Sequence, residues 1–164
     1  MGASVVPLPR TRDALGLLAF LALAFGVLVL GGLAVGPAIV EWYPALRKPS
    51  WTPPGWVFGP VWTLLYPVVA VAGWRVWREG RRPAVLLYLA QLALNAAWPW
   101  LFFAERRPGL ALVDAALLFA AILATAFAFW RVHRGAALLL LPYLGWVGFA
   151  LALNHAIWRL NPGG

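Results

Sequence analysis

The chain of 164 residues contains no cysteine, and only 11% of its residues are charged. Without cysteine it can form no disulfide, thiolate nucleophile or cysteine-ligated metal site. Its two histidines, His133 and His155, have no neighbouring ligands at the spacing of a metal site. Hydrolase nucleophile elbows, phosphate-binding glycine loops and paired catalytic carboxylates are also missing. We therefore expect no metal, no required cofactor, and few residues that could support enzyme chemistry.

Hydrophobic residues make up 63% of the chain, which is too apolar for a soluble domain of this size. Five runs are long enough to cross about 30 Å of hydrocarbon as helices. Short connections follow the second, third and fourth runs, so sequential helices should be antiparallel neighbours. We predict an all-α membrane protein, a single domain over residues 1–164, with a bundle of five transmembrane helices over residues 14–36, 55–77, 84–104, 110–131 and 136–158.

The net charge of +8 comes from basic residues at the borders of these runs. Attraction to anionic lipid headgroups explains that placement, so we expect the lipid bilayer, and no nucleic acid, as the partner of this charge. Eight basic residues lie on the side of the N-terminus and five on the other, which favours a cytoplasmic N-terminus. The first run is too long for a secretory signal and indicates a retained helix. The sequence thus predicts a multi-pass integral protein of a bacterial cell membrane.

The connection over residues 37–54 is unusually long and rich in rings and prolines. Loops of this length often act as lids over binding sites. Prolines at positions 44, 49, 53 and 54 argue against a regular helix and lower the cost of ordering such a lid. Tryptophan also favours the headgroup region of a membrane, so Trp42 and Trp51 fit an interfacial anchor equally well.

Three of the predicted helices carry aromatic and amide side chains along one face. Residues at helical spacing share a face, and these faces consist of Phe58, Trp62 and Tyr66, of Gln91, Asn95 and Trp98, and of Tyr143, Trp146, Ala150 and Asn154. Amides are costly in hydrocarbon unless paired, so Gln91, Asn95 and Asn154 should face the bundle interior. There they could join helices by hydrogen bonds alone, or line a cavity for a large planar or polycyclic ligand.

Asp114 is the one carboxylate within the predicted helices. In the first turn of the fourth helix it would gain from the helix dipole and reach toward Arg106 or Arg107. Coupling to proton movement is the alternative. Alanines recur on the same helix at helix-contact spacing, which fits packing within the bundle or a dimer face.

Three segments, WYPALRKPSWTPPGWVFGPVWTLLY, QLALNAAWPWLFF and PYLGWVGFALALN, occur in this order. They resemble the motifs of the tryptophan-rich sensory protein or translocator protein (TspO/MBR) family, also called peripheral benzodiazepine receptors. The resemblance covers nearly the whole chain. It implies a five-helix membrane bundle, often a homodimer, that binds porphyrins, sterols or benzodiazepine-type ligands in a pocket closed by the first loop.

The resemblance also implies roles for individual residues. Tyr43 and Pro53 would belong to the lid, and the pocket would be lined by Trp62, Tyr66, Asn95, Trp98, Trp146 and Ala150. Trp62 and Trp146 match the family positions associated with light- and oxygen-dependent breakdown of protoporphyrin IX. We therefore expect a homodimeric membrane protein that binds or senses porphyrin-like tetrapyrroles. Porphyrin degradation, or transport of a porphyrin or sterol, are the alternatives.

Overall fold

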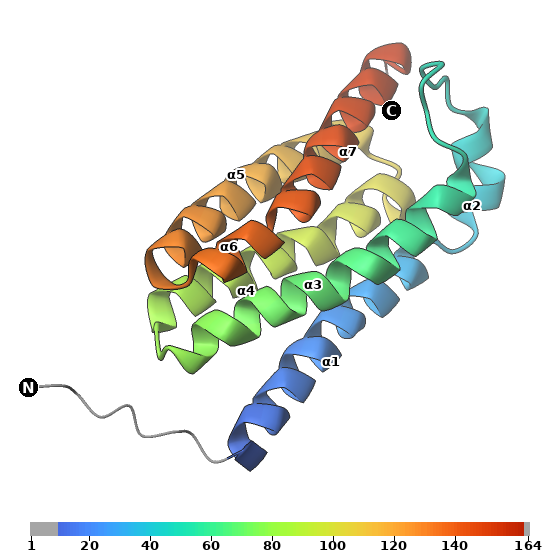
Figure 1. Ribbon diagram of the computed structural model, residues 1–164. Coiled ribbons are helices and arrows are strands. Elements are labelled where there is room, and N and C mark those ends of the chain that lie inside the picture. The colour runs from blue at the N-terminus through green and yellow to red at the C-terminus, as the bar shows by residue number, and fades with distance from the viewer. Residues whose placement is uncertain (1–9, 163–164) are drawn as a thin grey trace, which may run out of the picture.

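The computed structural model describes residues 10–162 as a bundle of helices, with no strand in that range (Figure 1). Five segments are long and apolar enough to cross a membrane: Arg10–Val35, Gly55–Arg78, Arg82–Ala104, Pro108–Val132 and Arg134–Leu160. Their α-helices are α1 (Arg10–Val35), α3 (Phe58–Arg78), α4 (Arg82–Pro99), α5 (Pro108–Val132), α6 (Arg134–Leu139) and α7 (Leu141–Leu160). The predicted all-α bundle of five transmembrane segments is confirmed. The predicted domain also included residues 1–9 and 163–164, which lie outside the described range.

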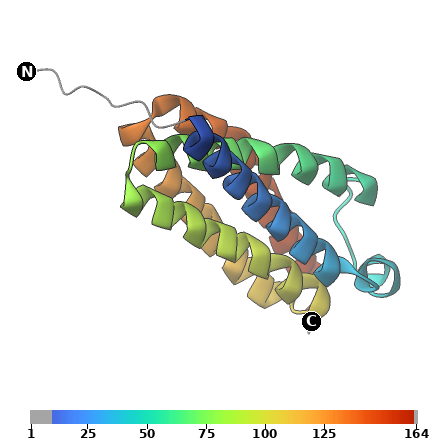
Figure 2. The same ribbon diagram turned by 90° about the horizontal axis from the view of Figure 1, so that it is seen from below.

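The contacts between the helices close into a ring, and Figure 2 shows α1 running between α3 and α4. α1 contacts α3 and α4, α5 contacts α4 and α7, and α3 closes the ring against α6. Ala70 and Ala72 of α3 are fully buried and allow neighbouring helices to approach closely. Large apolar side chains such as Leu18 and Leu33 of α1 stay exposed, as expected of a surface that faces lipid.

Two of the spans contain breaks where the sequence predicted unbroken helices. The last span divides at Leu140 into α6 and α7, because Pro142 in the first turn of α7 has no N–H to donate to the preceding turn. The third span leaves α-helical geometry after Pro99 and continues as the π-helix η3 (Trp100–Ala104). Phe102 and Phe103 of this π turn are buried, so the break lies at the end of the bundle that residues 37–54 cover.

The connection between α1 and α3 contains short helical turns. These are α2 (Ala38–Glu41) and the 3₁₀ turns η1 (Tyr43–Ala45) and η2 (Gly55–Val57). The prediction of a segment without regular helix is therefore wrong for its first half. Pro37 precedes α2, and Pro44 lies in the first turn of η1, positions where the missing N–H breaks no helical bond.

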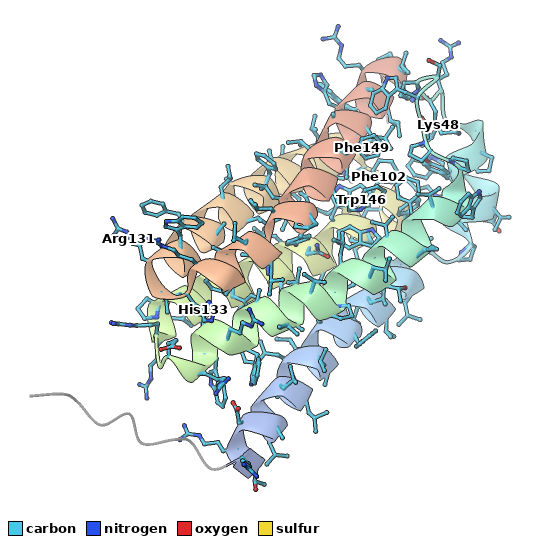
Figure 3. All side chains as sticks on the ribbon, in the orientation of Figure 1. Lys48, Phe102, Arg131, His133, Trp146 and Phe149 are labelled. Carbon is cyan, nitrogen blue, oxygen red and sulfur yellow. The ribbon has the colours of Figure 1, made fainter. Side chains whose placement is uncertain are left out.

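At the bundle end that holds the start of α1, several arginines lie over the faces of aromatic rings. Arg78 lies over the Trp74 ring at 4.9 Å and also pairs with Asp13 at 2.8 Å. Arg134 lies over Trp130 at 5.6 Å. Figure 3 shows Arg131 and His133 at this end and Lys48 at the opposite end. Indole and guanidinium groups stacked in this way suit the membrane interface, so the two charged ends mark the borders of the span.

We predict that Gly73→Ala destabilises the protein by roughly 1–3 kcal/mol, the usual cost of overpacking a core. A Cβ at Gly73 would lie 2.7 Å from the Tyr88 ring and 2.8 Å from Phe20. Both rings are buried and have little room to move. Gly145→Ala in α7 is the matched control, because a Cβ there meets open space. Thermal unfolding in detergent micelles compares the two, and equal melting temperatures would contradict this packing.

Candidate functional site

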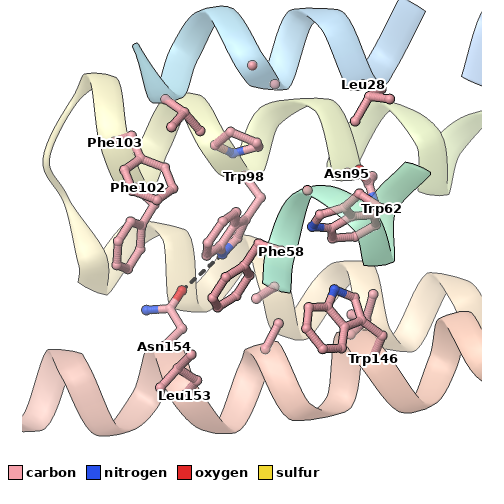
Figure 4. A pocket seen from close by; sticks show the side chains of 18 of the residues that line it. Leu28, Phe58, Trp62, Asn95, Trp98, Phe102, Phe103, Trp146, Leu153 and Asn154 are labelled. Carbon is pink, nitrogen blue, oxygen red and sulfur yellow. Dashed lines mark hydrogen bonds between the residues drawn. The ribbon is translucent and has the colours of Figure 1, made fainter. Parts of the chain in front are cut away.

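A cavity of about 340 Å³ lies inside the bundle at the end that carries residues 37–54 (Figure 4). Its wall is formed by side chains of α1, α3, α4, α5 and α7, together with Ile39 and Tyr43 of the connection. Most of these side chains are apolar or aromatic. Pockets for small ligands typically measure about 300–1,000 Å³ and have such walls with a few polar groups.

The structure brings most of the predicted site residues together around this cavity. The wall includes seven of them: Tyr43, Trp62, Tyr66, Asn95, Trp98, Trp146 and Ala150. Pro53 is not among the lining residues; Tyr43 and Gly55 reach the cavity from either side of it in the chain. Sequence reasoning did not assign the glycines Gly31, Gly32 and Gly59 to the wall, because a residue without a side chain gives no periodic signal.

Asn95 joins three helices at one side of the cavity. Tyr66 of α3 donates its hydroxyl hydrogen to Asn95 Oδ1 at 2.6 Å, and Asn95 Nδ2 donates to the Tyr143 hydroxyl of α7 at 2.8 Å. Tyr143 in turn donates to Gln91 Oε1 at 2.7 Å. All four side chains are buried, which confirms that Gln91 and Asn95 face the interior. Gln91 and Asn95 therefore link helices by hydrogen bonds, and these bonds hold part of the cavity wall in place.

A second amide holds the Trp98 ring. Trp98 Nε1 donates to Asn154 Oδ1 at 3.0 Å, the bond drawn in Figure 4. Asn154 Nδ2 donates to the main-chain carbonyl of Pro108 at 2.9 Å, so α4, α5 and α7 meet at this residue. Asn154 is 1% exposed and faces the interior as predicted. Its amide is fully engaged in positioning a ring of the wall.

The indole nitrogen of Trp146, another residue of the wall, is not engaged in a hydrogen bond in the part of the chain that the structure describes. Its Nε1–H is buried and has no hydrogen-bond partner among residues 10–162. In Figure 4 the indole nitrogen lies on the side of the ring that faces Trp62. An indole N–H can only donate, so an oxygen or nitrogen acceptor would be needed to satisfy it.

The chain also resembles known proteins over most of its length. The model of the TspO/MBR family matches residues 18–159. The translocator protein of Homo sapiens is 47% identical over 130 residues, which is 76% of this chain and 77% of that protein. The Tryptophan-rich protein TspO of Archaeoglobus fulgidus is 40% identical over 148 residues, 88% of this chain and 94% of its own length. The Tryptophan-rich sensory protein of Cereibacter sphaeroides is 41% identical over 122 residues, 74% and 77% of the two chains.

The chain belongs to the TspO/MBR family. Membership confirms the resemblance seen in the three sequence segments. Together with the five apolar spans, it makes the chain a multi-pass integral membrane protein.

In this TspO/MBR protein, hydrogen bonds fasten the connection over residues 37–54 to the end of the bundle. Asn161, after α7, accepts the N–H of Arg47 at 3.0 Å and donates to the Arg47 carbonyl at 2.9 Å. Lys48 donates to the carbonyls of Tyr43 and Leu46 at 2.7 and 2.9 Å, and its ammonium lies 4.7 Å from the Tyr43 ring centre. Burial of Tyr43 within this connection raises the pKa of its phenol. The segment is thus folded over the cavity.

Asp114 lies elsewhere than predicted. Because α5 begins at Pro108, Asp114 falls in its second turn, and its side chain is only 7% exposed. Its Oδ2 has no hydrogen-bond partner within the described part of the chain. Arg106 instead approaches Glu41, at 3.9 Å. The predicted contact with Arg106 or Arg107 is wrong, since the carboxyl lies on the buried face of α5 and Arg106 approaches Glu41 instead.

We predict that Tyr66→Phe and Asn95→Ala are energetically coupled. Each variant removes one end of the 2.6 Å bond, and Asn95→Ala also leaves the Tyr143 hydroxyl without its donor. Hydrogen bonds between membrane helices contribute about 0.6 kcal/mol on average and up to about 1.7, so a coupling energy near the upper value is expected for a buried network. Unfolding of the two single variants and the double variant in detergent measures it. Strictly additive losses would show that the bond contributes nothing to stability.

Proposed function

We propose that this TspO/MBR protein binds flat, largely apolar polycyclic molecules of the porphyrin type in the cavity beneath residues 37–54. The observation that supports the proposal best is the composition of the wall, where the indole rings of Trp62, Trp98 and Trp146 come from three different helices and line one cavity. Flat aromatic rings gain most from contact with another flat ring system.

The way the polar groups are used favours binding over chemistry. The amides of Asn95 and Asn154 are engaged with neighbouring side chains and main chain. The hydroxyl of Tyr66 is engaged with Asn95 in the same way. The wall therefore offers stacking surfaces and the Trp146 N–H donor, a combination that can orient a ring system with a few polar substituents.

The name of one relative agrees with a role in sensing. It is called a tryptophan-rich sensory protein, whereas another relative is called a translocator protein. A protein whose binding changes the state of its loop could report the level of a tetrapyrrole in the membrane. Residues 43–48 are suited to such a change, because a small number of hydrogen bonds holds them in place.

We predict that protoporphyrin IX quenches the tryptophan fluorescence of the purified protein saturably, and that Trp62→Ala and Trp146→Ala each weaken binding at least tenfold, about 1.4 kcal/mol. Each substitution removes one stacking surface of the wall. Trp130→Ala is the matched control, since Trp130 is an exposed residue of α5 that does not line the cavity. Wild-type affinity in both cavity variants would show that the ligand binds elsewhere.

Porphyrin breakdown is a second candidate, because both indoles line the same cavity and would lie beside a bound ring. Under light and oxygen, bound protoporphyrin IX should then convert to a defined product. We expect Trp62→Phe or Trp146→Phe to stop that conversion while binding persists, which chromatography of the extracted pigment would detect. Equal bleaching in both variants and the wild type would show that the loss of pigment is its own photochemistry and does not depend on these tryptophans.

A further inference from the structure

The connection over residues 37–54 is fastened at the loop end of the cavity. The two hydrogen bonds between Arg47 and Asn161 tie the connection to the end of α7. Lys48 ties the same segment to its own carbonyls. A ligand that came from the aqueous side would have to break these contacts first.

The side between α3 and α7 is closed by rings. Phe58 of α3 meets Trp146 of α7 edge-on, with ring centres 5.6 Å apart. Trp146 also packs on Phe149 at 5.4 Å, and Phe149 meets Trp51 of the connection at 5.8 Å. These four rings form a continuous row along this side of the bundle.

The side between α1 and α3 is built differently. Gly32 of α1, and Gly55 and Gly59 at the start of the second span, line the cavity and are also exposed on the outside of the bundle. A Cβ at any of the three would meet open space within 4 Å. The neighbouring Gly31 of α1 faces Pro99 of α4, at 3.3 Å from a Cβ built there. The wall is therefore thin at these glycines.

Helix α1 is held against α3 mainly at the opposite end of the bundle. There Asp13 pairs with Arg78, and the Phe20 and Trp77 rings lie 6.3 Å apart. Toward the loop the two helices separate in Figure 2, and α1 contacts α4 and η3 instead. The glycines thus lie where α3 gives α1 the least support.

We propose that the cavity opens sideways to the bilayer between α1 and α3, and that its ligand enters from the lipid phase through a window bounded by Gly32 and Gly59. The inference rests on the proposed function, and it specifies how the ligand reaches the site. The ligand would first partition into one leaflet of the bilayer. Gly32 lies about one turn from the end of α1, and Gly59 about one turn from Gly55, so the window is close to the interface at the loop end.

This depth suits a flat amphiphile. Polar substituents such as carboxylates can remain at the headgroup level while the apolar ring system moves past the glycines. The rim also includes Leu28 and Val35 of α1 and Ile39 of α2, which are apolar and compatible with lipid chains.

The test is the rate of ligand exchange in variants that fill the window. Gly32→Leu and Gly59→Leu place a branched side chain in the gap. Gly26→Leu in α1 and Gly145→Leu in α7 are matched controls, since both glycines are exposed, meet open space and do not line the cavity. Liposomes loaded with protoporphyrin IX are mixed with proteoliposomes, and tryptophan quenching is followed in time.

We expect association and dissociation to slow at least tenfold in Gly32→Leu and Gly59→Leu, with the controls unchanged. Equal slowing of both rates is the signature of a blocked route. Unchanged rates would overturn the proposal. Weaker affinity with faster dissociation would also overturn it, since leucine would then occupy the binding space itself.

Cross-linking the connection over residues 37–54 to the end of α7 distinguishes entry through the window from entry past the loop. The chain has no cysteine, so Arg47→Cys with Asn161→Cys can be joined selectively by a short thiol-reactive linker. Exchange through the window should continue at the wild-type rate after linking. Loss of exchange in the linked protein, restored when a reducible linker is cleaved, would assign access to the loop and refute the window.

Failure of the proposed function can be distinguished from failure of the window. If wild-type protein shows no saturable quenching by protoporphyrin IX, the ligand class is wrong. The window is then tested with anthracene, a flat apolar fluorophore that accepts energy from tryptophan, delivered from the same liposomes. Slower sensitised emission in Gly59→Leu than in Gly145→Leu supports the window, and equal rates refute it.

Discussion

The amide of Asn95 is the link on which the arrangement of the bundle depends. In lipid, helices gain no hydrophobic free energy from meeting one another, so packing and hydrogen bonds decide how they associate. Asn95 of α4 bonds with Tyr66 of α3 and Tyr143 of α7 at once, and Tyr143 continues to Gln91. Each of these groups would be costly in hydrocarbon without its partner. One residue therefore sets the relative positions of three helices.

The rings around the cavity take their orientation from this network and from its neighbour at Asn154. Trp62 stacks on Tyr66, with ring centres 5.3 Å apart, and Tyr66 is fixed by Asn95. Trp98 is fixed in the same way by Asn154. Because these side chains are already held in position, the protein loses less conformational entropy when a ligand binds. The polar groups thus act through the rings, which fits a binding site better than a reactive one.

Helical periodicity in the sequence predicted much of this site. Phe58, Trp62 and Tyr66 repeat every four residues, so they share a face, and all three line the cavity. The same rule applies to Asn95 with Trp98 and to Trp146 with Ala150, although it could not say which faces meet. The family resemblance supplied that pairing, and in the structure Trp62, Asn95 and Trp146 of three different helices line one cavity.

Other features depend on contacts between distant parts of the chain and could not be predicted. The bonds between Arg47 and Asn161 join residues 114 positions apart, with no pattern to connect them. The burial of Asp114 depends on which face of α5 packs against the neighbouring helices, and the sequence alone does not show which faces meet. The window at Gly32 and Gly59 could not be predicted either, because it depends on where α1 and α3 separate in the folded bundle.

An electron-density map of the protein crystallised in lipid with protoporphyrin IX tests the central claim most directly. We predict that the macrocycle lies inside the cavity, between the Trp62 and Trp146 rings and under residues 43–48, with an acceptor atom near the Trp146 N–H. A macrocycle bound on the outer surface of the bundle, with the cavity filled only by lipid or water, would contradict it.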